Sequence, residues 1–342
     1  MSQLPRKGPL RLSVTSASLT LFLGALAAGW PVGAAAQATG PAPASPGARR
    51  AAHATAASTL EGPLVLRLPA SARMLGMANA GVASNDGDAI FYNPGMLTQA
   101  RGVAMSVQRY GSRATAGSVG SVQTIGALSV GIGAQLLQYG ADARDPGAIS
   151  RQGAARLADG GDEPAASSAV TVGVGRTIKG YRVGAAVKYA EERIGATRDG
   201  VLAFDLGLNM ALGPATLAVS VQNLGAGPDL SSVSGPLPTR VTVGYGGGLF
   251  PIWERWDIGM QTQLSVEADG FVRPAGGVEL GYVPIEGVAL VMRSGLRLPR
   301  EPDEPLATVG FGVTADRFSL DWALEPVRGG RPVSHRVGFR LK

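Results

Sequence analysis

Apolar residues recur at every second position along most of the chain after Arg101, and this alternation constrains the fold more than any other feature of the sequence. The clearest examples are residues 204–212, 256–266 and 318–325. A period of two is typical of β-strands whose two faces meet different surroundings. The pattern therefore predicts an all-β fold, in which one face of each strand is apolar and the other is polar or small.

Fourteen segments are candidate strands on this basis. They are residues 102–110, 114–123, 126–138, 168–178, 181–192, 201–212, 215–223, 239–250, 255–267, 272–282, 287–297, 306–314, 317–325 and 332–342. Most are 9 to 13 residues long, which suits tilted strands that cross the hydrocarbon layer of a membrane.

The connections between these segments distinguish a membrane barrel from a soluble β-sandwich, because alternation alone fits both. Most connections after even-numbered segments are tight turns, whereas several after odd-numbered segments are long. The long ones are residues 140–167, 224–238, 297–305 and 325–331. Short turns at one rim and long loops at the other are typical of outer-membrane proteins. We therefore predict a single transmembrane antiparallel β-barrel of about 14 strands, residues 102–342, with both of its ends on the periplasmic side.

The N-terminal residues have the organisation of an export signal. Basic residues (Arg6, Lys7 and Arg11) precede the apolar stretch 19–30, and small residues suited to cleavage follow at 34–38. We expect residues 1–37 to be a signal peptide that is removed, and residues 38–60, rich in Ala, Pro and Gly, to form a disordered linker. The expected location is the bacterial outer membrane.

Composition and motif content argue against enzymes and nucleic-acid-binding proteins. The chain has no cysteine, which removes disulfides and thiolate metal sites, and its net charge of +6 is not concentrated in a basic stripe. His335, which alternates in phase with Val337 and Phe339, is the one histidine outside the linker, and we expect it to face lipid or the rim. We therefore predict a non-enzymatic protein with no cofactor, no metal site and no nucleic-acid partner.

A segment rich in small residues lies between the linker and the first strand. Residues 71–97 read SARMLGMANAGVASNDGDAIFYNPGML. Small residues allow a backbone to approach its neighbours closely, and Asn93-Pro94 is a sequence that favours a turn. These residue types suit a segment that packs inside a barrel.

This segment resembles the N-terminal signature of the FadL-type and PorV-type outer-membrane proteins. The resemblance is carried by Ala72, Arg73, Leu75, Gly76, Met77, Ala80, Gly81, Val82, Ala83, Asp86, Asp88, Ala89, Phe91, Tyr92, Asn93 and Pro94. It implies a fourteen-stranded barrel with a plug, or hatch, in the periplasmic half of the lumen, which we assign to residues 61–101. Members of these families usually have Asn-Pro-Ala where this chain has Asn93-Pro94-Gly95.

Two sets of residues are therefore candidates for function. The predicted hatch or gate residues are Gly76, Met77, Gly81, Phe91, Asn93, Pro94 and Gly95. The predicted lumen-facing charges, taken from the phase of the alternation, are Arg182, Lys188, Asp205, Asp257, Glu279, Arg293, Asp321, Arg336 and Arg340. Mixed charge of this kind suits anchoring of a hatch better than an apolar conduit.

The resemblance leaves two functional hypotheses open beside a purely structural barrel. The first is FadL-like passage of small hydrophobic molecules, with gating by the hatch. The alternative is a PorV-like, non-enzymatic scaffold or shuttle for secreted or surface proteins. The expected partners are outer-membrane lipid together with hydrophobic small molecules or exported proteins. Whether the hatch gates the pore or only fills it is open at this point.

Overall fold

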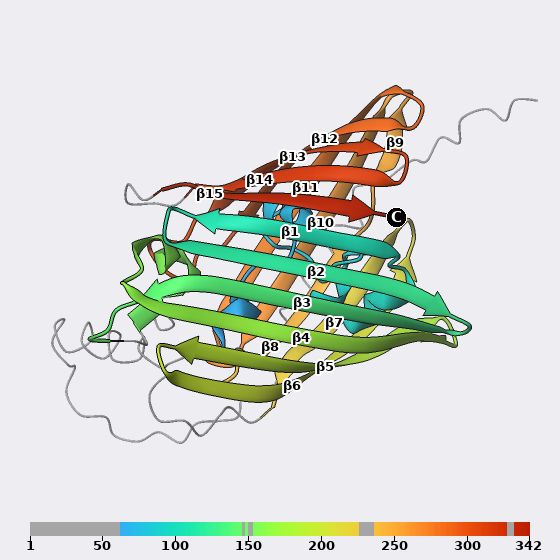
Figure 1. Cartoon of the computed structure of the whole chain (residues 1–342). Coiled ribbons are helices and arrows are strands. Elements are labelled where there is room, and N and C mark those ends of the chain that lie inside the picture. The colour runs from blue at the N-terminus through green and yellow to red at the C-terminus, as the bar shows by residue number, and fades with distance from the viewer. Residues whose placement is uncertain (1–61, 146–147, 150–152, 226–235, 327–331) are drawn as a thin grey trace, which may run out of the picture. The chain divides into compact units, whose positions relative to one another are not determined.

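β-Strands occupy most of the chain between Gly102 and Leu341 (Figure 1). The computed structural model describes residues 62–145, 148–149, 153–225, 236–326 and 332–342, so the predicted signal peptide (1–37) and linker (38–60) lie outside the described residues. The strands of the described part are β1 (Gly102–Tyr110), β2 (Ala114–Ile125), β3 (Leu128–Ala141), β4 (Glu163–Ile178), β5 (Tyr181–Ile194), β6 (Thr197–Leu212), β7 (Ala215–Leu224), β8 (Arg240–Gly246), β9 (Phe250–Trp253), β10 (Trp256–Glu267), β11 (Val272–Ile285), β12 (Val288–Arg297), β13 (Ala307–Ala315), β14 (Phe318–Glu325) and β15 (Ser334–Leu341).

These strands form one closed antiparallel barrel. Each pairs with its neighbours in chain order, and β1 pairs with β15, for example Val103 with Leu341. β8 and β9 lie one after the other along the same edge of β10, so the fifteen segments make a wall of fourteen strands. The predicted fold class, an antiparallel barrel of about 14 strands, is confirmed.

The wall differs most from the predicted strands in two places. The predicted strand 239–250 is interrupted after Gly246, where three consecutive glycines offer no side chain to pack and weaken a strand interior. β4 begins at Glu163, five residues before the predicted start, and pairs there with Ala141 of β3. Both differences extend or divide strands without changing the order of the wall.

The two rims have different connections. At one rim the chain turns tightly, as at Lys179-Gly180, where both residues have positive φ (49° and 85°), the geometry that suits a two-residue hairpin. At the other rim several connections are longer, and the one between β3 and β4 includes the 3₁₀ helix η4 (Ala154–Asp159). We call these the short-turn rim and the long-loop rim.

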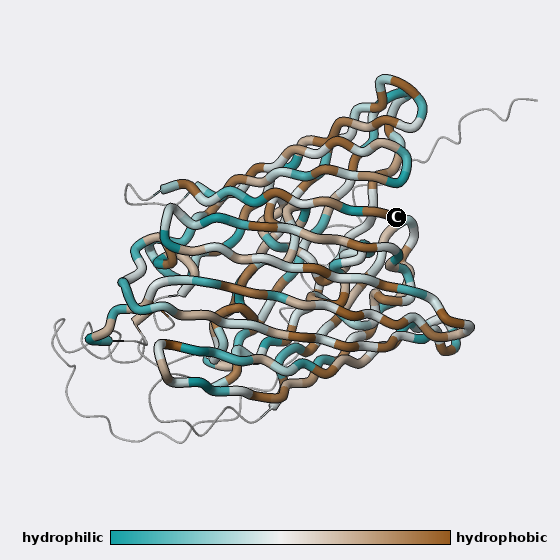
Figure 2. Tube along the Cα trace, viewed as in Figure 1, coloured by the Kyte–Doolittle hydropathy of each residue, from teal (hydrophilic) through white to brown (hydrophobic). Residues whose placement is uncertain are grey.

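The exterior of the barrel is apolar. In β6, Leu202, Phe204 and Leu206 are 56%, 48% and 51% exposed, whereas the intervening Asp205 is fully buried. Figure 2 shows hydrophobic and hydrophilic positions alternating along the strands. A continuous apolar exterior is the surface that a membrane barrel presents to lipid. Trp256 and Tyr282 pair at the short-turn rim with ring centroids 4.9 Å apart, where aromatic side chains anchor barrels at the interface. Within the described part of the chain, no helix has the length and apolarity needed to span a membrane.

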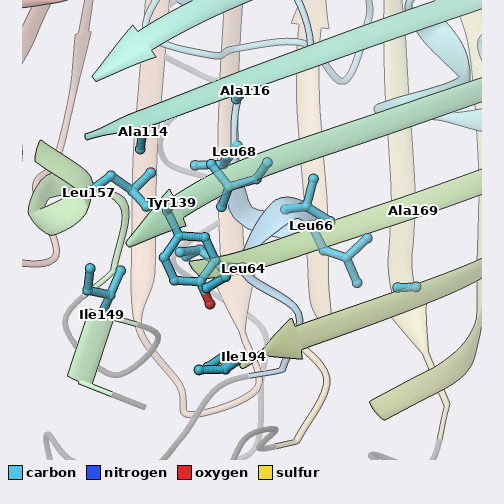
Figure 3. Close-up of a cluster of buried hydrophobic side chains, with 14 of the residues drawn as sticks. Leu64, Leu66, Leu68, Ala114, Ala116, Tyr139, Ile149, Leu157, Ala169 and Ile194 are labelled. Carbon is cyan, nitrogen blue, oxygen red and sulfur yellow. The ribbon is translucent and has the colours of Figure 1, made fainter. Parts of the chain in front are cut away.

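The N-terminal segment lies inside the lumen. It contains η1 (Leu64–Arg67), α3 (Ala72–Gly76), η2 (Ala89–Phe91) and η3 (Pro94–Thr98). Leu64, Leu66 and Leu68 pack against Tyr139 and Leu157 near the long-loop rim (Figure 3). Since η3 contacts β4, β5 and β6 close to their short turns, the segment extends through both halves of the lumen rather than the periplasmic half alone. The apolar residues of η1, which the motif does not include, explain this difference.

Candidate functional site

The hatch begins with a short capped helix. Ser71 Oγ accepts a hydrogen bond from the backbone N–H of Met74 at 3.0 Å, so the first turn of α3 has a side-chain cap. The helix ends at Gly76, and Ala78 and Asn79 then take positive φ values of 57° and 62°. This left-handed pair reverses the chain and keeps the hatch compact enough to stay within the lumen.

The turn Asn93-Pro94-Gly95 is held by one buried amide. Asn93 Oδ1 accepts from Gly95 N at 2.9 Å, and its Nδ2 donates to the carbonyl oxygen of Val82 at 3.1 Å. Pro94 occupies the first position of η3, where its missing N–H costs no hydrogen bond. A Cβ added at Gly95 would lie 2.9 Å from the carbonyl carbon of Gly207 in β6. The close approach accounts for glycine at this position.

Glycines of the wall leave the space that the predicted gate residues occupy. A Cβ added at Gly277 of β11 would lie 2.6 Å from Cα of Met77, and one added at Gly133 of β3 would lie 2.5 Å from the ring of Phe91. Gly76 lies beside Gly310, Gly81 lies under the ring of Tyr92, and Pro94 lies against Gly184. All seven predicted gate residues are buried at contacts within the hatch or between the hatch and the wall.

Six buried side chains form a closed ring of alternating charge that joins the hatch to four strands. The ring runs Arg73–Glu279–Arg293–Asp321–Arg340–Asp86 and back to Arg73. Arg73 of α3 binds Glu279 of β11 with two hydrogen bonds, of 2.5 and 3.0 Å, and donates to Asp86 of the hatch at 2.8 Å. Arg340 of β15 donates to Asp86 at 2.5 Å and to Asp321 of β14 at 2.7 Å. We refer to this set as the charge ring.

The ring holds its hatch members in their charged forms. Burial alone would raise the pKa of Asp86, but Arg340, Arg73 and Lys342 hold it well below its ordinary value. Burial likewise opposes the charge of Arg73, yet Glu279 and Asp86 raise its pKa well above the usual range. Because each buried charge has at least two opposite partners, the desolvation penalty of each is offset within the ring.

The remaining predicted lumen-facing charges lie elsewhere on the wall. Lys188 of β5 pairs with Asp205 of β6 at 2.7 Å, and both are buried. Arg336 of β15 is 1% exposed and donates to the neutral side chains of Ser106, Gln108 and Ser118 at 2.9 to 3.0 Å. Arg182 and Asp257 are only partly buried, and Arg182 donates to Asn209 at 3.4 Å.

A cavity of about 150 Å³ lies between the hatch and the long-loop rim. Its lining includes Arg67 and Asn79 of the N-terminal segment and the loops that follow β10 and β12. Five arginines line it: Arg67, Arg240, Arg273, Arg297 and Arg300. Five acids accompany them: Glu267, Asp269, Glu301, Glu304 and Glu325. The space above the hatch is therefore lined by charged side chains together with apolar ones such as Leu66 and Leu237.

Glu301, on the loop after β12, is the acid of this cavity with a titration in the neutral range. Burial raises the pKa of Glu301 to about 7, and Glu304 raises it too, against the lowering effects of Arg67, Arg300 and Arg156. Its neighbour Glu304 has a lowered pKa, because Arg273 and Arg297 outweigh its burial. The charge of Glu301 therefore changes between about pH 6 and pH 8.

Sequence reasoning missed several residues of this site. Arg73 and Asp86 belong to the recognised motif, but no role had been assigned to either; charged residues among so many small ones were the available signal. Arg240 and Tyr110 line the cavity from the ends of β8 and β1. Tyr110 shares the buried face of β1 with Gln108 and Ser106.

Comparison with known proteins identifies the class of fold. No protein-family model matches the chain, and no curated protein matches its sequence. Among solved structures, the CymD monoaromatic hydrocarbon channel superposes with a TM-score of 0.51 at 10% identity, covering 83% of this chain and 98% of that one. The P. putida toluene transporter TodX gives a TM-score of 0.51 at 11% identity, covering 78% of this chain and 98% of its own. The predicted resemblance to FadL-type proteins is thereby confirmed for the fold, a closed antiparallel β-barrel with an N-terminal segment in its lumen.

Proposed function

We propose that the protein is an outer-membrane channel that passes small hydrophobic molecules and is gated by its hatch. The observation that carries the proposal is a lumen filled by a segment that is held to the wall largely by side-chain contacts and close packing. Two proteins with the same fold, a monoaromatic hydrocarbon channel and a toluene transporter, support it.

Passage requires the hatch to move. Met77, Phe91 and Pro94 lie against wall glycines at distances that leave no room for another atom. The charge ring lies across the lumen between the hatch and β11, β12, β14 and β15. A solute that enters from the long-loop rim therefore reaches a closed surface, and we assign the gating step to displacement of residues 71–97.

A cross-link between the hatch and the wall tests this step. Cβ of Ala72 lies 3.0 Å from the position that a Cβ at Gly338 of β15 would occupy, about 0.5 Å short of the Cβ–Cβ range of a disulfide, so a small outward shift of the hatch allows the bond to form. The chain has no cysteine, so the variant Ala72→Cys with Gly338→Cys carries one possible intramolecular pair. Ala72 is 30 residues before the first strand at Gly102, so the bond would tie down most of the hatch.

The measurement is uptake of radiolabelled toluene by intact bacterial cells that carry the protein, whose outer membrane slows hydrophobic solutes. We expect uptake above that of cells without the protein, loss of this excess on oxidation of the double variant, and its return on reduction. Each single-cysteine variant, oxidised in parallel, controls for the substitutions. Uptake that persists when the cross-link is complete would exclude gating by the hatch. No uptake by the reduced protein, together with stable co-purification of an exported protein, would favour the scaffold function instead.

A further inference from the structure

The cavity above the hatch has a size and charge that define a class of ligand. Its volume of about 150 Å³ equals that of an engineered protein cavity that binds benzene, so it accommodates one ring but not a long acyl chain. A wholly apolar lining would suit a hydrocarbon. This lining combines apolar residues, such as Leu66 and Leu237, with the five arginines and five acids described above.

Most of these charges are already paired. Arg297 binds Glu325, Arg273 binds Glu304 at 2.9 Å, and Arg300 binds Glu267. Arg300 also binds Asp269 at 2.5 Å. Four of the five acids are therefore held by arginines and offer little to a cationic ligand.

Arg240 differs from Arg273, Arg297 and Arg300, each of which forms an ion pair with an acid of the cavity. Its Nε donates to the neutral amide oxygen of Gln222 at 2.9 Å, and within the described part of the chain it forms no ion pair. The carboxylate of Glu267, which also lines the cavity, is taken by Arg300 and Arg273. A guanidinium at a cavity surface without a carboxylate partner is a ready site for an anion, since Arg presents a fork of donors to two oxygens.

A second polar group in the cavity has no partner. Tyr110, 5% exposed, lines the cavity, and its hydroxyl has no hydrogen-bond partner among the described residues. A buried hydroxyl without a hydrogen-bond partner is destabilising. A polar ligand, or a water molecule that enters with the ligand, removes this cost by forming the missing hydrogen bond. Both open groups therefore favour a polar ligand over a hydrocarbon.

We propose that this cavity binds small organic acids of about one ring in size, with Arg240 as the residue that binds the carboxylate. The proposal rests on the proposed function for the route of the solute, and it adds a second class of solute, organic acids, that is retained in the space reached before the hatch. A hydrocarbon in the same place would strip water from Arg240 and return no hydrogen bond, so it passes this space without being retained.

The test is equilibrium binding to the purified mature barrel in detergent, with three ligands that share one ring: benzoate, benzyl alcohol and benzylamine. We expect benzoate to bind at least tenfold more tightly than either of the others. Benzyl alcohol has no charge to pair with Arg240, and benzylamine has a positive charge that Arg240 repels. Equal or tighter binding of benzyl alcohol overturns the proposal. This comparison needs no variant, so it decides the matter whatever the folding of any substitution.

Two variants locate the site. Arg240→Gln should weaken benzoate binding by about tenfold or more and leave benzyl alcohol unchanged. The matched control is Arg198→Gln, which removes an arginine that lies at the long-loop rim, pairs with Glu191 and is exposed. Unchanged benzoate affinity in a folded Arg240→Gln protein overturns the assignment of this residue. Because binding is measured without transport, loss of toluene uptake would refute the proposed function and leave this result standing.

Discussion

Replacing Arg73 with methionine removes one corner of the charge ring and nearly preserves side-chain volume. Arg73 donates three hydrogen bonds to two buried carboxylates, those of Glu279 and Asp86. Removing one partner of a buried ion pair costs about 3–5 kcal/mol. Glu279 keeps Arg293 and Asp86 keeps Arg340, so the lower figure, about 3 kcal/mol, is the appropriate one. Release of the hatch should therefore become roughly 100-fold more favourable.

Hydrogen exchange of peptides from residues 71–97 measures this release, because exchange under native conditions reports the local opening equilibrium. We expect about 100-fold faster exchange in the hatch of the Arg73→Met protein and unchanged exchange in the strands. Arg113→Met is the matched control, since Arg113 and its partner Asp162 are 48% and 99% exposed and such pairs contribute little. Unchanged exchange in the hatch, or equal acceleration in the wall, would refute the idea that the ring holds the hatch.

Three further outcomes follow from the same structure. Asn93→Ala removes two buried hydrogen bonds and should destabilise the hatch by about 1–3 kcal/mol, seen as faster exchange in residues 82–97 but not in the strands. Benzoate affinity should rise as the pH falls from about 8 to about 6, because Glu301, with its pKa raised to about 7, loses its negative charge there; Glu301→Gln should remove the dependence. Leu206→Arg, in the middle of the lipid-facing side of β6, should lower the free energy of unfolding in lipid vesicles by about 2–4 kcal/mol, whereas Leu212→Arg beside the short turn should change it by about 0–1 kcal/mol; similar values for the two would contradict a membrane mid-plane near Leu206.

The wall of the barrel was predictable because lipid and lumen impose opposite requirements on successive residues. Phe204 and Leu206 face outward and Asp205 faces inward, so the sequence itself records the two faces. The first residues of β4 were missed for a related reason. Glu163 and Pro164 lie beyond the apolar band, where neither face of the strand meets lipid and the alternation disappears.

The charge ring was only partly predictable. The phase of the strands placed Glu279, Arg293 and Asp321 on the same face, but no local pattern states which charges meet. The bond between Arg340 and Asp86 joins residues 254 positions apart, and it depends both on barrel closure and on the path of the hatch. Pairings of that kind are set by the register of the whole wall, which single-strand periodicity does not contain.

The chemistry of the ring suits a hatch that has to return to one position. Apolar packing against wall glycines excludes water, but it does not by itself define a unique position for the hatch, because apolar contacts are not directional. The ring adds direction, because Arg73 fits Glu279 only through two simultaneous hydrogen bonds. A buried ion-pair network contributes little net stability relative to apolar residues of the same volume, because its members regain hydration when they separate. On the proposed gating mechanism, the ring therefore fixes where the hatch closes without making the open state prohibitively unfavourable, and an apolar replacement of all six residues would hold the hatch more firmly and less specifically.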